Sequence, residues 1–213
     1  MEIKLIHVMP HPLASIEHGE SSIWGNQATL KAGNKILLNA SSGKGKSTFS
    51  MTIFGIRKDY TGTILYDGKD IRTISVDDWV KIRQTKLSSV FQDLQLFSNI
   101  TVAENLHLKN ELTQFKSELE MKNMLAELEI EHKWNEPCGL LSMGQQQRVA
   151  IIRSLCQPFS WLIMDEPFSH LDEQNSLRCL SLINREATSQ NAGFVLTSLD
   201  DDSRFPYDLE LKL

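Results

Sequence analysis

The sequence predicts an α/β fold whose core is a mainly parallel β-sheet. Short apolar segments at residues 36–38, 161–164 and 194–197 have the length of buried strands. Segments of helical periodicity alternate with them, as at residues 173–189. Residues 2–8 instead alternate polar and apolar side chains, which indicates a half-buried strand in an N-terminal antiparallel β part.

The 213 residues are predicted to form one domain with a helical subdomain inserted into its core. The α/β core is expected at residues 1–92 and 141–213, and the subdomain at about residues 93–140. Within that stretch, apolar residues recur at nearly helical spacing. They are Phe115, Leu119, Met124, Leu125 and Leu128.

Composition points to an ordinary soluble protein of the reducing cytosol. Hydrophobic residues make up 41% and charged residues 23% of the chain. The net charge of −5, without a basic block, argues against nucleic acid as a partner. We expect no membrane span, since no apolar run approaches the roughly 20 residues needed, and no signal peptide. Cys138, Cys156 and Cys179 lack metal spacing and are expected to be free.

The loop at residues 39–48 has the layout of a phosphate-binding P-loop, because it joins an apolar strand to a helix and contains Gly45-Lys46-Ser47. Its small residues let backbone N–H groups surround phosphate oxygens. Lys46 is expected to reach the β- and γ-phosphates, and Ser47 to ligate Mg²⁺. The alternative is a Gly/Ser-rich surface loop. The predicted phosphate-binding residues are Ala40, Ser41, Ser42, Gly43, Lys44, Gly45, Lys46, Ser47 and Thr48.

Two acids directly follow the apolar strand at residues 161–164, as in the Walker B motif of P-loop NTPases. Asp165 is expected to hold Mg²⁺ through a water molecule, since Mg²⁺ keeps much of its hydration shell. Glu166 is expected to act as the general base that polarises the attacking water. A strand ending in a polar turn is the alternative, and the upstream Gly45-Lys46-Ser47 favours the catalytic interpretation.

The segment at residues 141–148, Leu-Ser-Met-Gly-Gln-Gln-Gln-Arg, resembles the signature motif of ATP-binding cassette (ABC) ATPases. Ser142 can cap a helix, and Gly144 allows backbone N–H groups to approach an anion. Gln92 resembles the Q-loop residue of the family, and residues 167–172 resemble its D-loop. Residues 88–97 and 101–105 look most like the lipoprotein-release and macrolide-export branch of the family.

This resemblance implies a P-loop NTPase (RecA-like) core that binds ATP and Mg²⁺ and hydrolyses ATP to energise a transporter or export complex. Gln92 would contribute to catalysis and to the metal site. Two copies would pair head to tail as a homodimer, so that Ser142, Gly144 and Gln145 bind the nucleotide held by the partner chain. A membrane-spanning permease would recruit the subunit to the cytoplasmic face of the inner membrane. Substrate, transport direction and permease identity are not encoded in these motifs.

Three positions depart from the family pattern. Ala40 stands for the first P-loop Gly, Met143 for a signature Gly, and Ser198 for the switch His that would contact the γ-phosphate. Ser198 offers one hydrogen bond without charge, so we expect ATP to bind and turnover to be slow. A nucleotide-binding module with weak or no hydrolysis, and a soluble ABC ATPase without a transport role, are the alternatives.

The residue that would stack on adenine is not marked by the sequence. Three side chains in the early part of the chain are candidates: His11, His18 and Trp24. Trp24 lies in a predicted strand, so a position in the core is the equal alternative for it.

Overall fold

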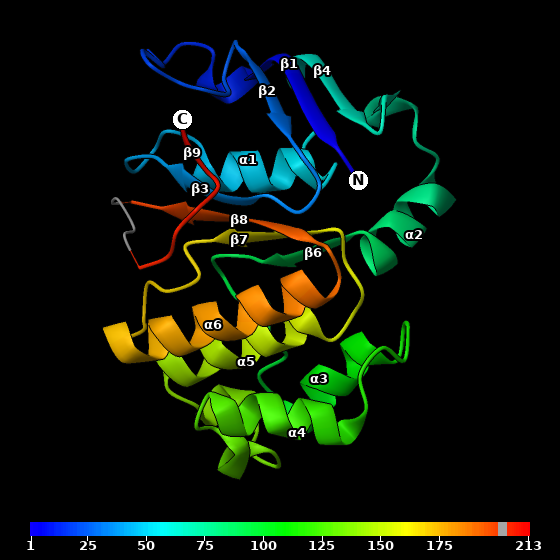
Figure 1. The fold of residues 1–213 in the computed structure, drawn as a ribbon, viewed down its shortest axis with the longest axis vertical. Helices are drawn as coiled ribbons and strands as arrows, with labels where there is room; N and C mark the ends of the chain where they lie inside the picture. The colour runs from blue at the N-terminus through cyan, green and yellow to red at the C-terminus, as the bar shows by residue number, and fades with distance from the viewer. Residues whose placement is uncertain (200–203) are drawn as a thin grey trace.

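Two β-sheets lie one above the other with helix α1 (Lys46–Ile53) between them, and further helices cover the opposite face of the lower sheet (Figure 1). This computed structural model describes residues 1–199 and 204–213. The resulting layers, from top to bottom, are a sheet, a helix, a second sheet, the helix pair α5 and α6, and the helix pair α3 and α4. The predicted α/β fold is confirmed.

The upper sheet is antiparallel, as residues 2–8 predicted, with strand order β2-β1-β4-β5. Strand β1 forms its centre, and a register shift between Ile6 and Met9 bends it against β4. The strands are β1 (Ile3–Pro10), β2 (Gln27–Leu30), β4 (Tyr60–Tyr66) and β5 (Lys69–Asp70).

The lower sheet has the order β6-β7-β8-β3-β9 and all of its pairings are parallel. Parallel strands place their carboxyl ends at one edge of the sheet, where α/β folds bind ligands. Here Asp165 lies opposite Thr197, and Ser198 lies opposite Asn39. The strands are β3 (Lys35–Asn39), β6 (Leu87–Val90), β7 (Trp161–Asp165), β8 (Gly193–Ser198) and β9 (Leu209–Lys212).

Most of the larger helices begin at a side chain that satisfies their first backbone N–H groups. Reciprocal capping boxes start α3 (Val102–Asn110), α4 (Glu118–Glu127) and α5 (Met143–Leu155). Ser75 caps α2 (Val76–Thr85), and Asp172 caps α6 (Glu173–Ser189). Single 3₁₀ turns occupy His11–Leu13, Ile71–Thr73, Glu131–Lys133 and Cys138–Leu140.

Two hydrophobic cores stabilise these layers. The first surrounds α1 and joins the two sheets, with Phe49 and Ile53 packed beside Trp161. The second lies below the lower sheet and includes Leu106 of α3, Leu125 of α4 and residues of α5 and α6. The inserted helices therefore share their core with α5 and α6. The exact division at about residues 93 and 140 stays a prediction.

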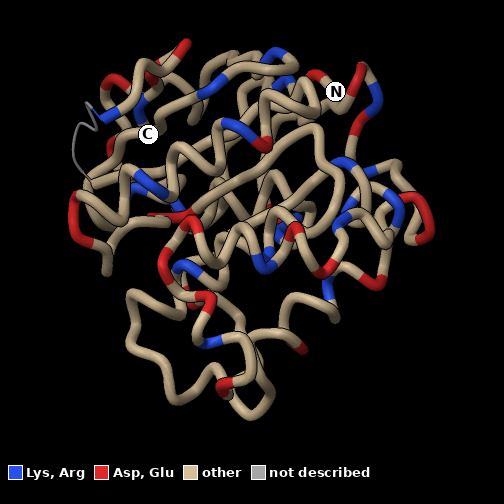
Figure 2. The backbone as a smooth tube through the Cα atoms, turned by 60° about the horizontal axis from the view of Figure 1, so that its bottom comes forward, with Lys and Arg blue, Asp and Glu red and all other residues tan. Residues whose placement is uncertain are grey.

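Basic and acidic residues are interspersed along the chain (Figure 2). Across residues 1–199 and 204–213, no helix combines the length and apolar character needed to cross a membrane.

The loop before α3 depends on the buried amide of Asn105. Its Oδ1 accepts the Phe97 N–H at 2.9 Å, and its Nδ2 donates to the carbonyls of Phe97 and Thr101, each at 3.0 Å. Asn105→Leu removes these partners from buried backbone groups, so we expect the free energy of unfolding to fall by about 3 kcal/mol. Urea denaturation measures this change. The exposed helical change Asn123→Leu is the control, and an equal effect of both would contradict the role of Asn105.

Candidate functional site

The loop between β3 and α1 has the backbone geometry of a phosphate cradle. Gly43 and Gly45 adopt left-handed conformations, with φ of +79° and +105°. The φ of Gly45 is one that other residues rarely adopt, and a Cβ there would also lie 2.5 Å from Leu13 Cδ1. Ala40 is not among the described residues with a positive φ, and its N–H donates to Ser198 O at 3.1 Å. Alanine therefore causes no backbone strain at this position.

Lys46 joins the loop to the acids that follow β7. Its side chain is only 6% exposed. The Nζ donates to the carbonyl of Ala40 at 2.7 Å and lies 3.3 Å from Oε1 of Glu166. A cation in this position faces both the phosphate cradle and the candidate general base. The two motifs, 120 positions apart in sequence (166 minus 46), thus meet in one site.

Thr197 of β8 holds both acids in place. Its Oγ1 donates to Oδ1 of Asp165 at 2.9 Å and accepts the N–H of Glu166 at 3.1 Å. Asp165 is 3% exposed, and Glu166 has a left-handed φ of +49°, which turns the chain away from the sheet. Sequence reasoning did not identify Thr197, because a threonine at the end of a strand has no distinctive spacing.

Three oxygen-bearing side chains come together next to Lys46. Ser47 Oγ donates to Oε1 of Gln92 at 3.4 Å, and both residues line one cleft with Asp165. Hydroxyl, amide and carboxylate oxygens are ligands that Mg²⁺ prefers. The donor set therefore fits the predicted metal site.

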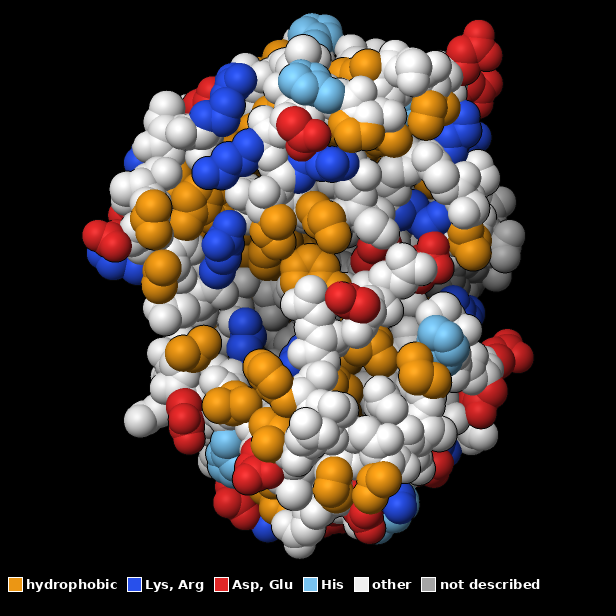
Figure 3. Space-filling model, turned by 180° about the vertical axis from the view of Figure 1, so that it is seen from behind, with side chains coloured by type: hydrophobic (Ala, Val, Ile, Leu, Met, Phe, Trp, Pro, Cys, Tyr) orange, Lys and Arg blue, Asp and Glu red, His pale blue; other side chains and the backbone are white. Residues whose placement is uncertain are grey.

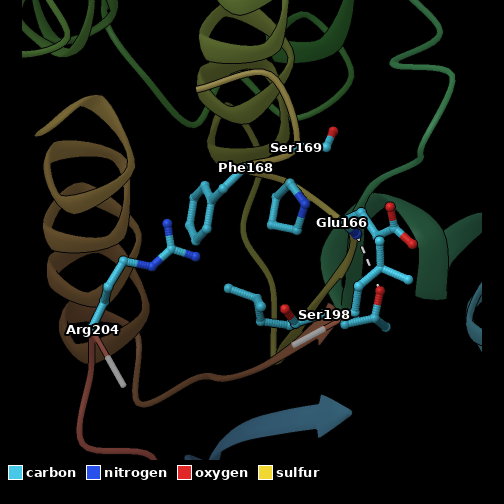
Figure 4. Close-up of a pocket in the computed structure, with 9 residues that line it drawn as sticks. Glu166, Phe168, Ser169, Ser198 and Arg204 are labelled. Carbon is cyan, nitrogen blue, oxygen red and sulfur yellow. Dashed lines mark hydrogen bonds between the residues drawn. The ribbon is translucent and has the colours of Figure 1, made fainter. Parts of the chain in front are cut away.

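Ser198 lies at the same edge of the sheet. It lines a pocket of about 170 Å³ with Glu166, Phe168, Ser169 and Arg204 (Figure 4). The guanidinium of Arg204 stacks on Phe168, with its Cζ 5.1 Å from the ring centroid. The structure thus places Ser198 beside the candidate general base.

The signature residues form the start of α5. Ser142 Oγ accepts the N–H of Gln145 at 3.3 Å, and Oε1 of Gln145 accepts the N–H of Ser142 at 3.0 Å. A Cβ on Gly144 would lie 2.8 Å from the carbonyl oxygen of His170, so this glycine also permits close packing of the D-loop. Residues 142–145 line neither of the two pockets described above.

Gln147 links α5 to the catalytic edge and was missed by sequence reasoning. Its side chain is 1% exposed. Its Nε2 donates to the carbonyl of Glu166 at 3.1 Å, and its Oε1 accepts the N–H of His170 at 3.0 Å. Gln147 is the last of three consecutive glutamines, and nothing in the sequence shows which of them is buried. The orientation of α5 in the fold determines that the Gln147 side chain faces the interior.

Trp24 is not available to stack on adenine, because it lies in the core, which was the alternative for this candidate. It is 2% exposed and packs edge-on against Phe49 at a centroid distance of 6.3 Å. Its Nε1 instead donates to the carbonyl of Lys44 at 3.2 Å and supports the loop. His18 is half-buried, with Nε2 bonded to Leu13 O at 2.8 Å, whereas His11 is exposed. That His11 or His18 stacks on adenine stays a prediction.

Residues 25–169 match the model of the ABC transporter family. The chain belongs to this family. Among its relatives, the lipoprotein-releasing system ATP-binding protein LolD of Buchnera aphidicola subsp. Schizaphis graminum is 34% identical over 191 residues, covering 86% of this chain and 82% of LolD. The cell division ATP-binding protein FtsE of Bacillus subtilis is 33% identical over 178 residues, covering 81% of this chain and 78% of FtsE.

Solved ABC structures have the same fold. The dimeric structure of MJ0796, a bacterial ABC transporter cassette, superimposes with a TM-score of 0.81 at 27% identity and covers 99% of this chain and 94% of its own. A post-hydrolysis state of that cassette bound to ADP and Pi gives 0.76 at 26% identity, covering 93% and 88%. The present chain is an ABC ATPase that hydrolyses ATP to energise a transporter.

Gln147→Leu tests the link between α5 and the catalytic edge. Leucine leaves the buried Glu166 carbonyl and His170 N–H without partners, so we expect a loss of about 2–3 kcal/mol in the free energy of unfolding. Since the Glu166 backbone loses its support, the ATPase rate should also fall. Urea titration and a phosphate-release assay measure the two effects. Gln174→Leu on the exposed face of α6 is the matched control, and equal behaviour of the two variants would contradict this assignment.

Proposed function

We propose that ATP binds with its phosphates in the loop at residues 40–48 and that Lys46 contacts the β- and γ-phosphates. The position of Lys46 carries this proposal, because its Nζ lies between the Ala40 carbonyl and Glu166. Lysine is a strong point-charge partner for phosphate oxygens. Backbone N–H groups around Gly43 and Gly45 and the N-terminus of α1 add further positive potential.

Mg²⁺ would be held by Ser47, Gln92 and Asp165, the last through water. The ion would neutralise charge that develops on the phosphates during transfer. Thr197 fixes the Asp165 carboxylate through its hydroxyl. Glu166 would orient and polarise the attacking water as general base. The shared pocket supports a role for Ser198 as a hydrogen-bond donor near that water, but a weaker one than an imidazole could play.

The active form we propose is a head-to-tail homodimer. Similarity to a dimeric ABC cassette supports it, with a TM-score of 0.81. So does the separation within one chain of Ser142, Gly144 and Gln145 from the pocket residues around Lys46. Each composite site would combine the P-loop of one chain with the signature residues of the other. ATP binding would close the dimer, and hydrolysis would reopen it.

A membrane-spanning permease would complete the transporter and hold this chain at the cytoplasmic face of the inner membrane. The likeness to LolD and to residue patterns of the lipoprotein-release and macrolide-export branch supports an export or extraction role. Its cargo would be recognised by the permease.

Glu166→Gln is expected to bind ATP and stop hydrolysis, because an amide cannot accept the proton of water. The ATP-bound dimer should then persist and elute earlier in size-exclusion chromatography. Glu173→Gln, in the exposed first turn of α6, should remain active. An unchanged oligomeric state of Glu166→Gln with ATP would count against the sandwich dimer.

Ser198 provides a second test. Ser198→Ala removes the proposed hydrogen-bond donor near the attacking water and should lower kcat about tenfold with little change in ATP affinity. Ser198→His should raise kcat above that of the native chain, since imidazole reaches further and can carry charge. Steady-state kinetics and nucleotide titration measure both constants. A high native turnover that is insensitive to Ser198→Ala would refute the role of Ser198.

A further inference from the structure

An exposed histidine, His170, lies in the D-loop next to the catalytic edge. The family pattern has an imidazole at the position of Ser198, and this chain has none there. Of the six histidines in the chain, His170 is the nearest in sequence to the candidate general base Glu166, at four positions (170 minus 166). Histidine side chains are scattered over the face seen from behind, at its top, right border and lower end (Figure 3). Their place in the fold, and not their number, therefore decides which imidazole can act in hydrolysis.

The backbone of His170 is held against the start of α5. Its N–H donates to Oε1 of the buried Gln147 at 3.0 Å. A Cβ on Gly144 would lie 2.8 Å from the carbonyl oxygen of His170, so the D-loop packs directly on the signature residues. His170 is not among the described residues that line the pocket around Ser198 or the cleft around Asp165. It therefore lies on the signature side of the chain and outside the site formed by the P-loop of that same chain.

A series of hydrogen bonds fixes the state of the His170 imidazole. Gln147 Nε2 donates to Oγ of Ser169 at 3.4 Å, and this Oγ lies 3.0 Å from Nδ1 of His170. Because the Ser169 oxygen accepts from the Gln147 amide, its own hydrogen is available for Nδ1. A neutral imidazole that accepts at Nδ1 carries its proton on Nε2. The exposed His170 ring thus has a hydrogen-bond donor at Nε2.

We propose that His170 serves the ATP site of the partner chain, where its Nε2–H donates to an oxygen of the γ-phosphate in place of the missing switch imidazole. This inference rests on the head-to-tail homodimer proposed above and deepens it. In that dimer the signature residues of one chain face the P-loop of the other. The adjoining His170 therefore meets the site in which the other chain has Ser198.

The hydrogen bond from His170 stabilises negative charge that develops on the phosphoryl oxygens during transfer. In the same step water attacks the γ-phosphorus, Glu166 of the chain that holds the P-loop accepts a proton from this water, and the bond to ADP breaks. The imidazole keeps its own proton throughout. Its contribution is therefore electrostatic and positional, as expected of a donor aimed at a developing charge.

Substitution at residue 170 tests the contribution to the rate. His170→Asn loses the donor at the Nε2 position and should lower kcat about tenfold with little change in ATP affinity. His170→Gln, whose amide nitrogen can reach the place of Nε2, should keep more of the native rate than His170→Asn. His132→Asn, the same replacement at an exposed position far along the chain, is the matched control and should behave as the native chain. Phosphate release and nucleotide titration measure both constants.

Mixed dimers distinguish service to the partner's site from action within one chain. A chain with His170→Asn is paired with a chain with Ser198→His, and in parallel a chain with both changes is paired with the native chain. Two different affinity tags allow each pair to be purified. If residue 170 serves the partner's site, each site of the first pair has one imidazole, whereas one site of the second pair has none. The first pair should then hydrolyse ATP faster.

The reverse order would assign His170 to the site of its own chain and overturn the proposal, as would equal rates of the two pairs. A native kcat in His170→Asn, or an equal loss in His132→Asn, would overturn it as well. ATP-dependent dimerisation of His170→Asn is measured in parallel in the Glu166→Gln background. Loss of the dimer in Glu166→Gln alone contradicts the proposed homodimer, whereas a normal dimer with a native kcat in His170→Asn contradicts only the role of His170.

Discussion

The buried ammonium of Lys46 is the interaction on which the site depends. A cation that is 6% exposed requires polar partners on every side. The chain supplies them from two directions, with the Ala40 carbonyl at 2.7 Å and the Glu166 carboxylate at 3.3 Å. These contacts bring the loop after β3 and the turn after β7 into one site. In the sheet, β8 lies between β7 and β3. The Lys46 side chain therefore spans the end of β8 to connect the segments that follow the two outer strands.

The surrounding layers keep this arrangement rigid. Trp24 supports the loop from above through Lys44, while Thr197 fixes both acids from the intervening strand. Gln147 ties the start of α5 to Glu166 and to the D-loop residue His170. Because Ser142 and Gly144 lie at the start of α5, one buried amide connects the helix that begins with the signature residues to the backbone of Glu166.

Motifs whose function depends on local backbone geometry were recognisable without coordinates. The glycines of residues 43–45, the two acids after an apolar strand and the Ser142 cap all act over a few residues, so their spacing identified them. The sheet class followed from strands alternating with helices. For Trp24 the sequence left adenine stacking and core packing as equal alternatives, because aromatic character does not reveal burial. Its place in the core under Gly45 depends on how β1, β2 and α1 pack.

The sequence by itself determined the family and the α/β class, and it predicted the residues of the candidate nucleotide site, because each is encoded in short segments. Only the tertiary structure decided which side chains hold that site together. Thr197 meets Asp165 across neighbouring strands, and Gln147 meets His170 across 23 positions (170 minus 147). Such pairs form only when the register of the strands and the packing of the helices are fixed, and no local pattern records either.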